Sequence, residues 1–298
     1  MGTAAEQRGS TGSSSSTDER FHLSGPSVPL DARLHAYRDG LADISLAGRI
    51  LAPHYARALL RGGGAHAAYV RSKADAESPA VSELLPGEGF AVLEYAGGWA
   101  WGYCTADHVV GYVEAIALAE PIVATHIVCE PWAPVAADSR ITAPVLANLP
   151  IGARLHGEEC GACLATEYGC VSLSHLRPIA EPGDDPVGVA ERLIGTLYLD
   201  GGRGPLGIDA TGLIQLALGL CGLAAPRLIE QQADLGAPLP QGAPLRPGDL
   251  VIAGDEIGLM IDDLMLIHAS RPAGRVTVEP AGVIKARHGE IAVRRIDL

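Results

Sequence analysis

Short runs of alternating apolar and polar residues, separated by glycine turns, constrain this chain more than any other feature. Examples are the segments 90–95, 99–103 and 109–113. With 37 glycines and 21 prolines among 298 residues, the chain favours many turns and short elements over a helical bundle. Short strands at regular spacing with glycine turns are typical of small antiparallel barrels. Hydrophobic residues make up 48% of the chain, which suffices for more than one buried core.

The charge balance narrows the classes of partner. The formal net charge of −13 disfavours binding to a phosphate backbone, so we expect no nucleic-acid partner. An acidic body suits an amine-bearing ligand instead. No run of about eighteen apolar residues is present, so we expect no membrane span. Residues 1–20 lack an apolar core segment, which predicts a disordered leader rather than a secretory signal, and residence in the cytoplasm.

Composition shifts divide the chain into four further parts. A helix-like run from Asp31 to Arg61 ends in three glycines, which predicts a helical N-terminal segment over 21–65. Alternating strands then predict a small barrel over 66–120. The segment 149–155 parallels 84–90, which predicts a second barrel over 121–180. After a Pro/Gly/Asp-rich linker at 181–186, the pattern over 181–298 becomes mixed α and β.

A cysteine cluster in the second barrel segment has residue types that zinc sites use. Its members are Cys160, Cys163 and Cys170, with His156 and His175 nearby. The second half of a zinc ligand set is missing, and small buried cysteines are common in strands. We therefore expect neither a metal nor another cofactor, and we take Cys221, near a helix end, as a buried structural thiol.

Three segments of the first barrel carry a resemblance to bacterial SH3-like domains: Leu84–Glu88, Gly97–Gly102 and Gly111–Val113. The second barrel segment matches more loosely. Such modules bind or position cell-wall peptides, or they act as scaffolds that shape a neighbouring cleft. Both roles stay open at this stage, because a fold alone does not establish a function.

The last 115 or so residues resemble the catalytic domain of the NlpC family of cell-wall cysteine peptidases. Five segments in the family's order carry the match: Gly195–Gly202, Gly207–Gln215, Ala225–Arg227 with Gln231-Gln232, Arg246–Val251, and Glu256–Ile261 with Leu266–Ala269. The resemblance implies a papain-like α+β domain and a relative that cleaves peptidoglycan stem peptides next to D-glutamate. The expected fold class is thus α+β, with two SH3-like barrels followed by a papain-like domain.

Two of the three residues at the family's catalytic positions differ in this sequence. The resemblance places the nucleophilic cysteine at Ala210, the histidine base at Glu256 and the third, orienting residue at His268. A helix N-terminus favours a thiolate, but a methyl group cannot attack a carbonyl. We expect Asp209 to cap the helix, and Glu256 to face His268 across neighbouring strands with Asp209 close by.

Other residues around the expected cleft are retained or altered. Asp200 replaces the family's tryptophan and Leu197 its proline. Six residues are candidates for ligand binding: Tyr198, Asp200, Asp209, Thr211, Arg227 and Gln231. A retained framework without reactive groups predicts a pseudopeptidase that binds a muropeptide or a related small peptide. Two alternatives stay open, namely an active or trapped endopeptidase and a structural protein with a vestigial cleft.

Three further interpretations of the site have less support in the sequence. The first is that Ala210 is an engineered Cys→Ala substitution that traps substrate. Such a variant would keep the family's histidine at position 256, but this sequence has Glu256 there. The second is that Thr211 replaces the nucleophile. On a helix, however, the side chain of Thr211 points about 100° away from that of Ala210. A metal site made of Asp200, Asp209, Glu256 and His268 lacks any recognised ligand spacing.

Overall fold

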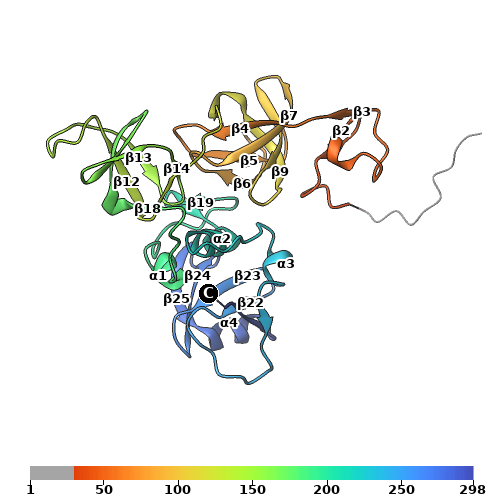
Figure 1. Cartoon of the computed structure of the whole chain (residues 1–298). Helices are drawn as coiled ribbons and strands as arrows, with labels where there is room; N and C mark the ends of the chain where they lie inside the picture. The colour runs from red at the N-terminus through yellow and green to blue at the C-terminus, as the bar shows by residue number, and fades with distance from the viewer. Residues whose placement is uncertain (1–29, 298) are drawn as a thin grey trace, which may run out of the picture. The chain divides into compact units, whose positions relative to one another are not determined.

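The computed structural model describes residues 30–297, which form a mixed α+β structure with many short strands and few helices (Figure 1). The expected leader over 1–20 lies outside the described residues, as do residues 21–29 of the expected helical segment. No helix within 30–297 has the length and apolar character that a membrane crossing needs.

The prediction of a helix between Asp31 and Arg61 is wrong. Gly40 and Gly48 both have φ +84°, a left-handed conformation that interrupts a right-handed helix, and Pro53 lacks the N–H that a helix interior needs. The segment contains one 3-10 helix and four strands: η1 (Ile44–Leu46), β1 (Tyr37–Arg38), β2 (Leu41–Asp43), β3 (His54–Ala56) and β4 (Leu59–Gly63).

Strand β4 joins the sheet that follows it, so the boundary expected at residue 65 is also wrong. Seven strands pair in the order β10-β4-β7-β8-β9-β5-β6. Val70, Phe90 and Val113 are fully buried in the core of this sheet. The remaining elements are β5 (Ala68–Arg71), β6 (Ala80–Leu84), β7 (Gly89–Ala96), β8 (Trp99–Cys104), β9 (Val110–Glu114), η2 (Ala115–Ala117) and β10 (Leu118–Ala119).

A second strand-rich region follows between residues 126 and 178. It holds a three-stranded sheet, β14-β11-β18, and a five-stranded sheet, β13-β12-β17-β16-β15. Val128, Leu164 and Val171 are completely buried between these strands. The elements are β11 (His126–Val128), β12 (Trp132–Ala136), β13 (Val145–Pro150), β14 (Arg154–Leu155), β15 (Glu158–Cys160), β16 (Cys163–Thr166), β17 (Gly169–Ser172), η3 (Leu173–His175) and β18 (Leu176–Pro178).

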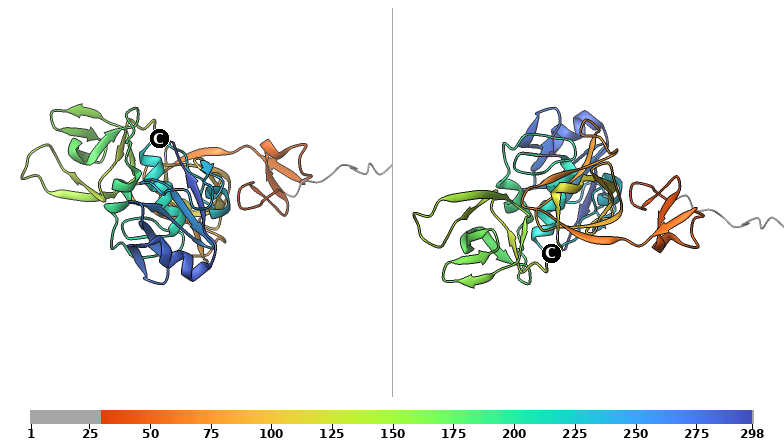
Figure 2. Two further views of the ribbon diagram at one scale, coloured as in Figure 1. Left: turned by 90° about the horizontal axis from the view of Figure 1, so that it is seen from below. Right: turned by 90° about the horizontal axis from the view of Figure 1, so that it is seen from above.

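The C-terminal region is built on a six-stranded sheet in the order β21-β26-β22-β23-β24-β25, with helices on both faces (Figures 1 and 2). Its elements are α1 (Pro186–Glu191), β19 (Arg203–Gly204), β20 (Gly207–Ile208), α2 (Ala210–Leu220), α3 (Ile229–Gln232), β21 (Ala237–Pro238), β22 (Leu250–Ala253), β23 (Glu256–Met260), β24 (Met265–Ser270), β25 (Arg275–Pro280), α4 (Ala281–His288) and β26 (Ala292–Arg295).

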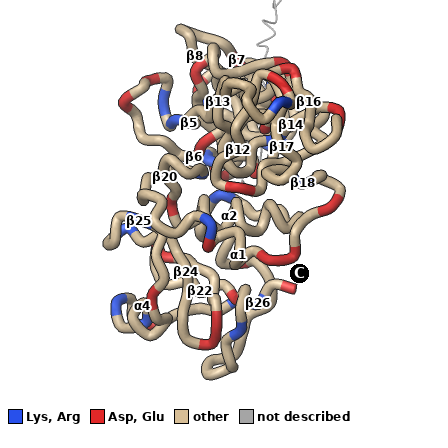
Figure 3. The backbone as a smooth tube through the Cα atoms, turned by 90° about the vertical axis from the view of Figure 1, so that its left-hand side faces the viewer, with Lys and Arg blue, Asp and Glu red and all other residues tan. Residues whose placement is uncertain are grey.

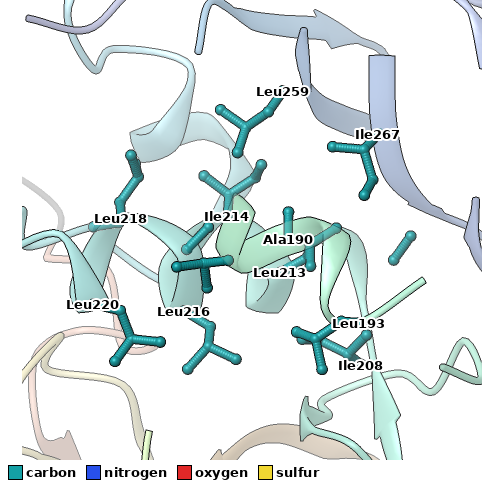
Figure 4. Close-up of a cluster of buried hydrophobic side chains, with 14 of the residues drawn as sticks. Ala190, Leu193, Ile208, Leu213, Ile214, Leu216, Leu218, Leu220, Leu259 and Ile267 are labelled. Atoms are coloured by element: carbon teal, nitrogen blue, oxygen red, sulfur yellow. The ribbon is translucent and has the colours of Figure 1, made fainter. Parts of the chain in front are cut away.

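Helix α2 lies in the largest buried apolar cluster (Figure 4), and its ends follow from local sequence signals. At its N-terminus Asp209 accepts a hydrogen bond from the N–H of Gly212 at 2.7 Å. At its C-terminus Gly222 adopts φ +78°, and the N–H of Leu223 bonds to the carbonyl of Leu218 at 3.0 Å. Leu213 and Ile214 are completely buried in this cluster, and each fully buried side chain of this kind contributes about 1.5–3 kcal/mol.

The close packing of β23 on β24 gives a first testable result. A Cβ at Gly258 would lie 2.6 Å from the carbonyl oxygen of Ile267 and 2.4 Å from Cδ1 of Leu266. We expect Gly258→Ala to lower the free energy of unfolding by about 1–3 kcal/mol through overpacking. Gly282→Ala in α4, where a Cβ meets nothing within 4 Å, should instead stabilise by up to about 1 kcal/mol. Urea titration of both variants checks this, and equal effects would contradict it.

Candidate functional site

The N-terminus of α2 is organised by the carboxylate of Asp209. Besides capping Gly212, this carboxylate accepts a hydrogen bond from the backbone N–H of Gly201 at 2.9 Å. It also forms a two-pronged ion pair with Arg227, at 2.9 and 2.6 Å. The Arg227 side chain is only 3% exposed and that of Asp209 13%. The expected capping role of Asp209 is therefore present in the structure, and the same carboxylate also neutralises a buried cation.

The side chains of Arg227 and Gln232 both form hydrogen bonds with the first turn of α2. Arg227 also bonds to the hydroxyl of Thr211 and, at 3.3 Å, to Ser82 of β6. The amide of Gln232 donates to the carbonyl of Thr211 at 2.9 Å and to that of Pro226 at 2.7 Å. The Thr211 hydroxyl is thus engaged in hydrogen bonds within this turn.

Gln232, and not the expected Gln231, makes these contacts with the first turn of α2. The family spacing of four residues between the arginine and the glutamine would have pointed to Gln232, counted from Arg227. The structure places Gln231 elsewhere, in the wall of a cavity of about 420 Å³ that is also lined by Asp43 and His108.

A polar rim borders the helix start on its exposed side. Arg271 bonds to the carboxylate of Asp200 at 2.7 Å and lies over the ring of Tyr198, with 5.3 Å to the ring centroid. The hydroxyl of Tyr198 lies 3.2 Å from Asp200. Partial burial raises the pKa of Tyr198, and the hydrogen bond from Arg271 opposes that rise. The rim thus holds both charge signs and one aromatic ring.

Glu256 does not lie beside Ala210. Ile257 packs in the cluster that contains the α2 side chains, whereas Met260 packs with Ile284 of α4. Because side chains alternate along a strand, Glu256 shares the α4 face of β23 with Met260. Ala210 is buried in the apolar cluster on the opposite face.

His268 lies on the same α4 face, one strand over, where it pairs in register with Gly258. Its imidazole Nε2 lies 2.6 Å from Glu279, not against Glu256 as expected. Arg287 of α4 connects the two carboxylates, bonding to Glu256 at 2.8 Å and to Glu279 at 3.2 Å. In place of the expected pair, Glu256, Arg287, Glu279 and His268 form a hydrogen-bonded chain, and Asp209 is not part of it.

Two glutamates of the first strand-rich region are buried against the C-terminal domain. Arg203 forms a two-pronged ion pair with Glu88 at 2.7 and 3.0 Å, and its backbone N–H donates to Glu83 at 2.7 Å. Burial raises the pKa of Glu83, and the N–H of Arg203 opposes that rise. For Arg203, burial favours a lower pKa, but the charge and hydrogen bonds of Glu88 leave it raised.

The metal interpretation finds no support among residues 30–297, where no group of three or more His, Cys, Asp and Glu side chains gathers in a way that would hold an ion. The four residues considered for it are split between two places. Asp200 and Asp209 lie near the start of α2, and Glu256 and His268 lie on the α4 face of the sheet.

Asp209 and Asp200 offer a matched pair of variants. Asp209→Asn keeps a capping oxygen but leaves Arg227 as a buried, unpaired cation, so we expect the free energy of unfolding to fall by about 3 kcal/mol or more. Asp200→Asn breaks an ion pair whose side chains are 60% and 66% exposed, and should cost less than about 1 kcal/mol. Chemical denaturation measures both, and a loss for Asp209→Asn as small as that for Asp200→Asn would contradict the prediction.

Comparison with known families agrees with this geometry. Residues 195–287 match the NlpC/P60 family, and residues 70–118 match the bacterial dipeptidyl-peptidase SH3 domain. Over residues 195–287 this chain is therefore similar to NlpC/P60 domains. NlpC/P60 is a family of peptidoglycan hydrolases. No curated protein matches the chain.

Solved structures extend the similarity beyond the NlpC/P60 domain. An NlpC/P60 family protein from Bacillus cereus ATCC 10987 superposes with a TM-score of 0.67 at 17% identity, over 80% of this chain and 99% of that one. An NlpC/P60 endopeptidase from Photobacterium damselae subsp. piscicida has a TM-score of 0.55 at 15% identity, over 78% of this chain and 70% of that one. At these identities the likeness concerns the fold.

Proposed function

We propose that this protein binds a peptidoglycan stem peptide, or a related small peptide, without cleaving it. The observation that carries the proposal is Ala210, a methyl group at the start of α2, where the family's sequence pattern has its nucleophilic cysteine. Without a nucleophile, neither a general base nor an orienting group can start acyl transfer.

The positions of the other two catalytic groups support the same proposal. Glu256 is bonded to Arg287 and His268 to Glu279, both on the face of the sheet away from α2. A general base must come within hydrogen-bond reach of the group that it deprotonates. Neither the Glu256 nor the His268 side chain is positioned to deprotonate a group at residue 210.

The ligand surface that we propose is the rim of Tyr198, Asp200 and Arg271, together with the first strand-rich region that packs against α2. An aromatic ring beside one carboxylate and one guanidinium suits the amine and carboxylate groups of a short peptide. We also propose that both strand-rich regions, 66–120 and 121–180, are SH3-like barrels that help to position this peptide beside the domain over 181–298.

Two measurements on the intact chain test the proposal. Incubation with purified stem peptides, followed by mass spectrometry, should show no new products, while an active NlpC/P60 enzyme run in parallel cleaves them. Isothermal titration with the same peptides should show binding that Arg271→Ala weakens and Arg140→Ala, an exposed control on another loop, leaves unchanged. Cleavage near ~1 s⁻¹, within the ordinary enzyme range, would overturn the proposal.

A second candidate is a structural protein with a vestigial cleft. The pair Arg227 and Asp209 favours it, because these two buried side chains occupy the N-terminus of α2 and satisfy each other's charge. If no stem peptide binds and none is cleaved, this candidate replaces the first.

A further inference from the structure

A cavity of about 320 Å³ lies at the other end of α2, away from Ala210. Its wall includes the last turn of α2 at Gly219 and Leu220, and Arg154 and Arg177 of the second strand-rich region. Since α2 rises about 1.5 Å per residue, Gly219 lies roughly 13 Å along the axis from Ala210. The cavity is thus distinct from the candidate site described above.

The polar wall of this cavity carries excess positive charge. Three guanidinium groups line it, from Arg154, Arg177 and Arg203, against the single carboxylate of Glu88. Glu88 is already paired on both oxygens with Arg203. Neither Arg154 nor Arg177 forms an ion pair within 4 Å with any residue that the structure describes. In a chain of net charge −13, two cations in one cavity without an ion-pair partner within 4 Å in the described residues favour an anion. The tube view shows basic positions beside β6 and α2 (Figure 3).

Three buried polar atoms of the same wall have no hydrogen-bond partner: Nε of Arg154, Nε of Arg203 and Oε1 of Gln215. Arg203 and Gln215 are each only 6% exposed. The orientation of the Gln215 amide is set by its nitrogen, which donates to Asp107 at 2.7 Å and to the carbonyl of Ala225 at 3.2 Å. Its oxygen is therefore left without a donor. Each such group costs about 1–3 kcal/mol when it stays unpaired.

We propose that this cavity binds the C-terminal residue of a peptide, meaning a carboxylate with an adjacent amide N–H and a small apolar side chain. The carboxylate would accept from the guanidinium groups of Arg154 and Arg177, and the N–H would donate to Oε1 of Gln215. Ile127 and Leu223 supply apolar wall for the side chain. The C-terminal end of the α2 dipole, worth about half a charge, opposes an anion less than two full cations attract it.

The volume suits this ligand class, because about 320 Å³ lies at the small end of the range for small-molecule sites. The proposal does not depend on whether the chain cleaves or binds stem peptides at the start of α2. Its failure and the failure of the proposed function are therefore separable.

The test uses N-acetylalanine of each chirality as the probe, with two analogues that each lack one feature. N-acetylalaninamide lacks the carboxylate and propionate lacks the N–H. Titration of the full-length protein, followed by calorimetry, should show binding of at least one N-acetylalanine enantiomer. We expect at least tenfold weaker binding of both analogues.

Variants locate the binding. Arg154→Met and Arg177→Met should each weaken N-acetylalanine binding at least tenfold, whereas Arg140→Met, which removes the same charge from an exposed loop, should leave it unchanged. Thermal unfolding of each variant identifies any loss of binding that comes from misfolding, and Arg177→Lys serves as a second variant that keeps the charge. Equal affinity for acid and amide, unchanged affinity in both arginine variants, or no binding of either enantiomer at millimolar concentration would overturn the proposal.

Discussion

Placing a cysteine at position 210 is expected to leave stem-peptide hydrolysis undetectable. Ala210→Cys puts a thiol at the start of α2, where the helix dipole favours its thiolate. The positions that would supply a base and its orienting partner, Glu256 and His268, lie on the α4 face of the sheet. We expect the turnover of Ala210→Cys to stay at least about 10³-fold below that of an active NlpC/P60 enzyme, because a thiol alone lacks the base that activates it.

The double variant Ala210→Cys with Glu256→His is expected to fail as well. Strand alternation directs residue 256 toward Arg287 and His288, not toward residue 210. Product release followed by mass spectrometry measures both variants, and alkylation of the introduced thiol establishes that the cysteine is present. Turnover near ~1 s⁻¹ in the double variant would show that position 256 reaches the helix start.

The largest expected effect on stability comes from Arg203. Its side chain and that of Glu88 are each 8% exposed and joined by two hydrogen bonds, so Arg203→Met leaves a buried carboxylate without its partner. We expect the free energy of unfolding to fall by about 3–5 kcal/mol at pH 7. Arg140→Met, with its side chain 74% exposed, should change it by less than about 1 kcal/mol. A loss below about 1 kcal/mol for Arg203→Met would contradict this.

The deficit of Arg203→Met should also depend on pH. Burial raises the pKa of Glu83, and the Arg203 charge opposes that rise, so its removal leaves this pKa higher still. A carboxyl group whose pKa is raised in the folded state stabilises the fold below its unfolded pKa, and this stabilisation is lost as the pH rises through the folded value. Denaturation at pH 4 and pH 7 should therefore show a smaller deficit at pH 4.

Local signals in the sequence agree with the ends of helix α2. Asp209 before an apolar run and Gly222 after it mark the two ends of α2, and both signals act within one or two turns. The N-terminal segment was mispredicted because its apolar spacing resembled a helix, while Gly40 and Gly48 required left-handed backbone. The spacing of apolar residues carries no information about the pairing of β4 with β7, which lies about thirty residues later in the chain.

The contacts that were missed depend on tertiary structure. Arg203 meets Glu83 and Glu88 across more than a hundred residues of chain, a distance at which periodicity carries no information. The family pattern likewise matched Glu256 to a catalytic position by order along the chain. Which face of β23 that residue occupies was decided by the packing of Ile257 on one side and Met260 on the other.

The hydrogen-bonded chain on the α4 face determines what a change at position 256 would disturb. Glu256 is 6% exposed and bonded to Arg287, which in turn bonds to Glu279, the partner of His268. A histidine at position 256 would remove one of the two carboxylates that pair with Arg287 and leave only that of Glu279. To place the family's histidine at position 256 and its cysteine at position 210 would therefore require coordinated changes in β23, in α4 and in α2.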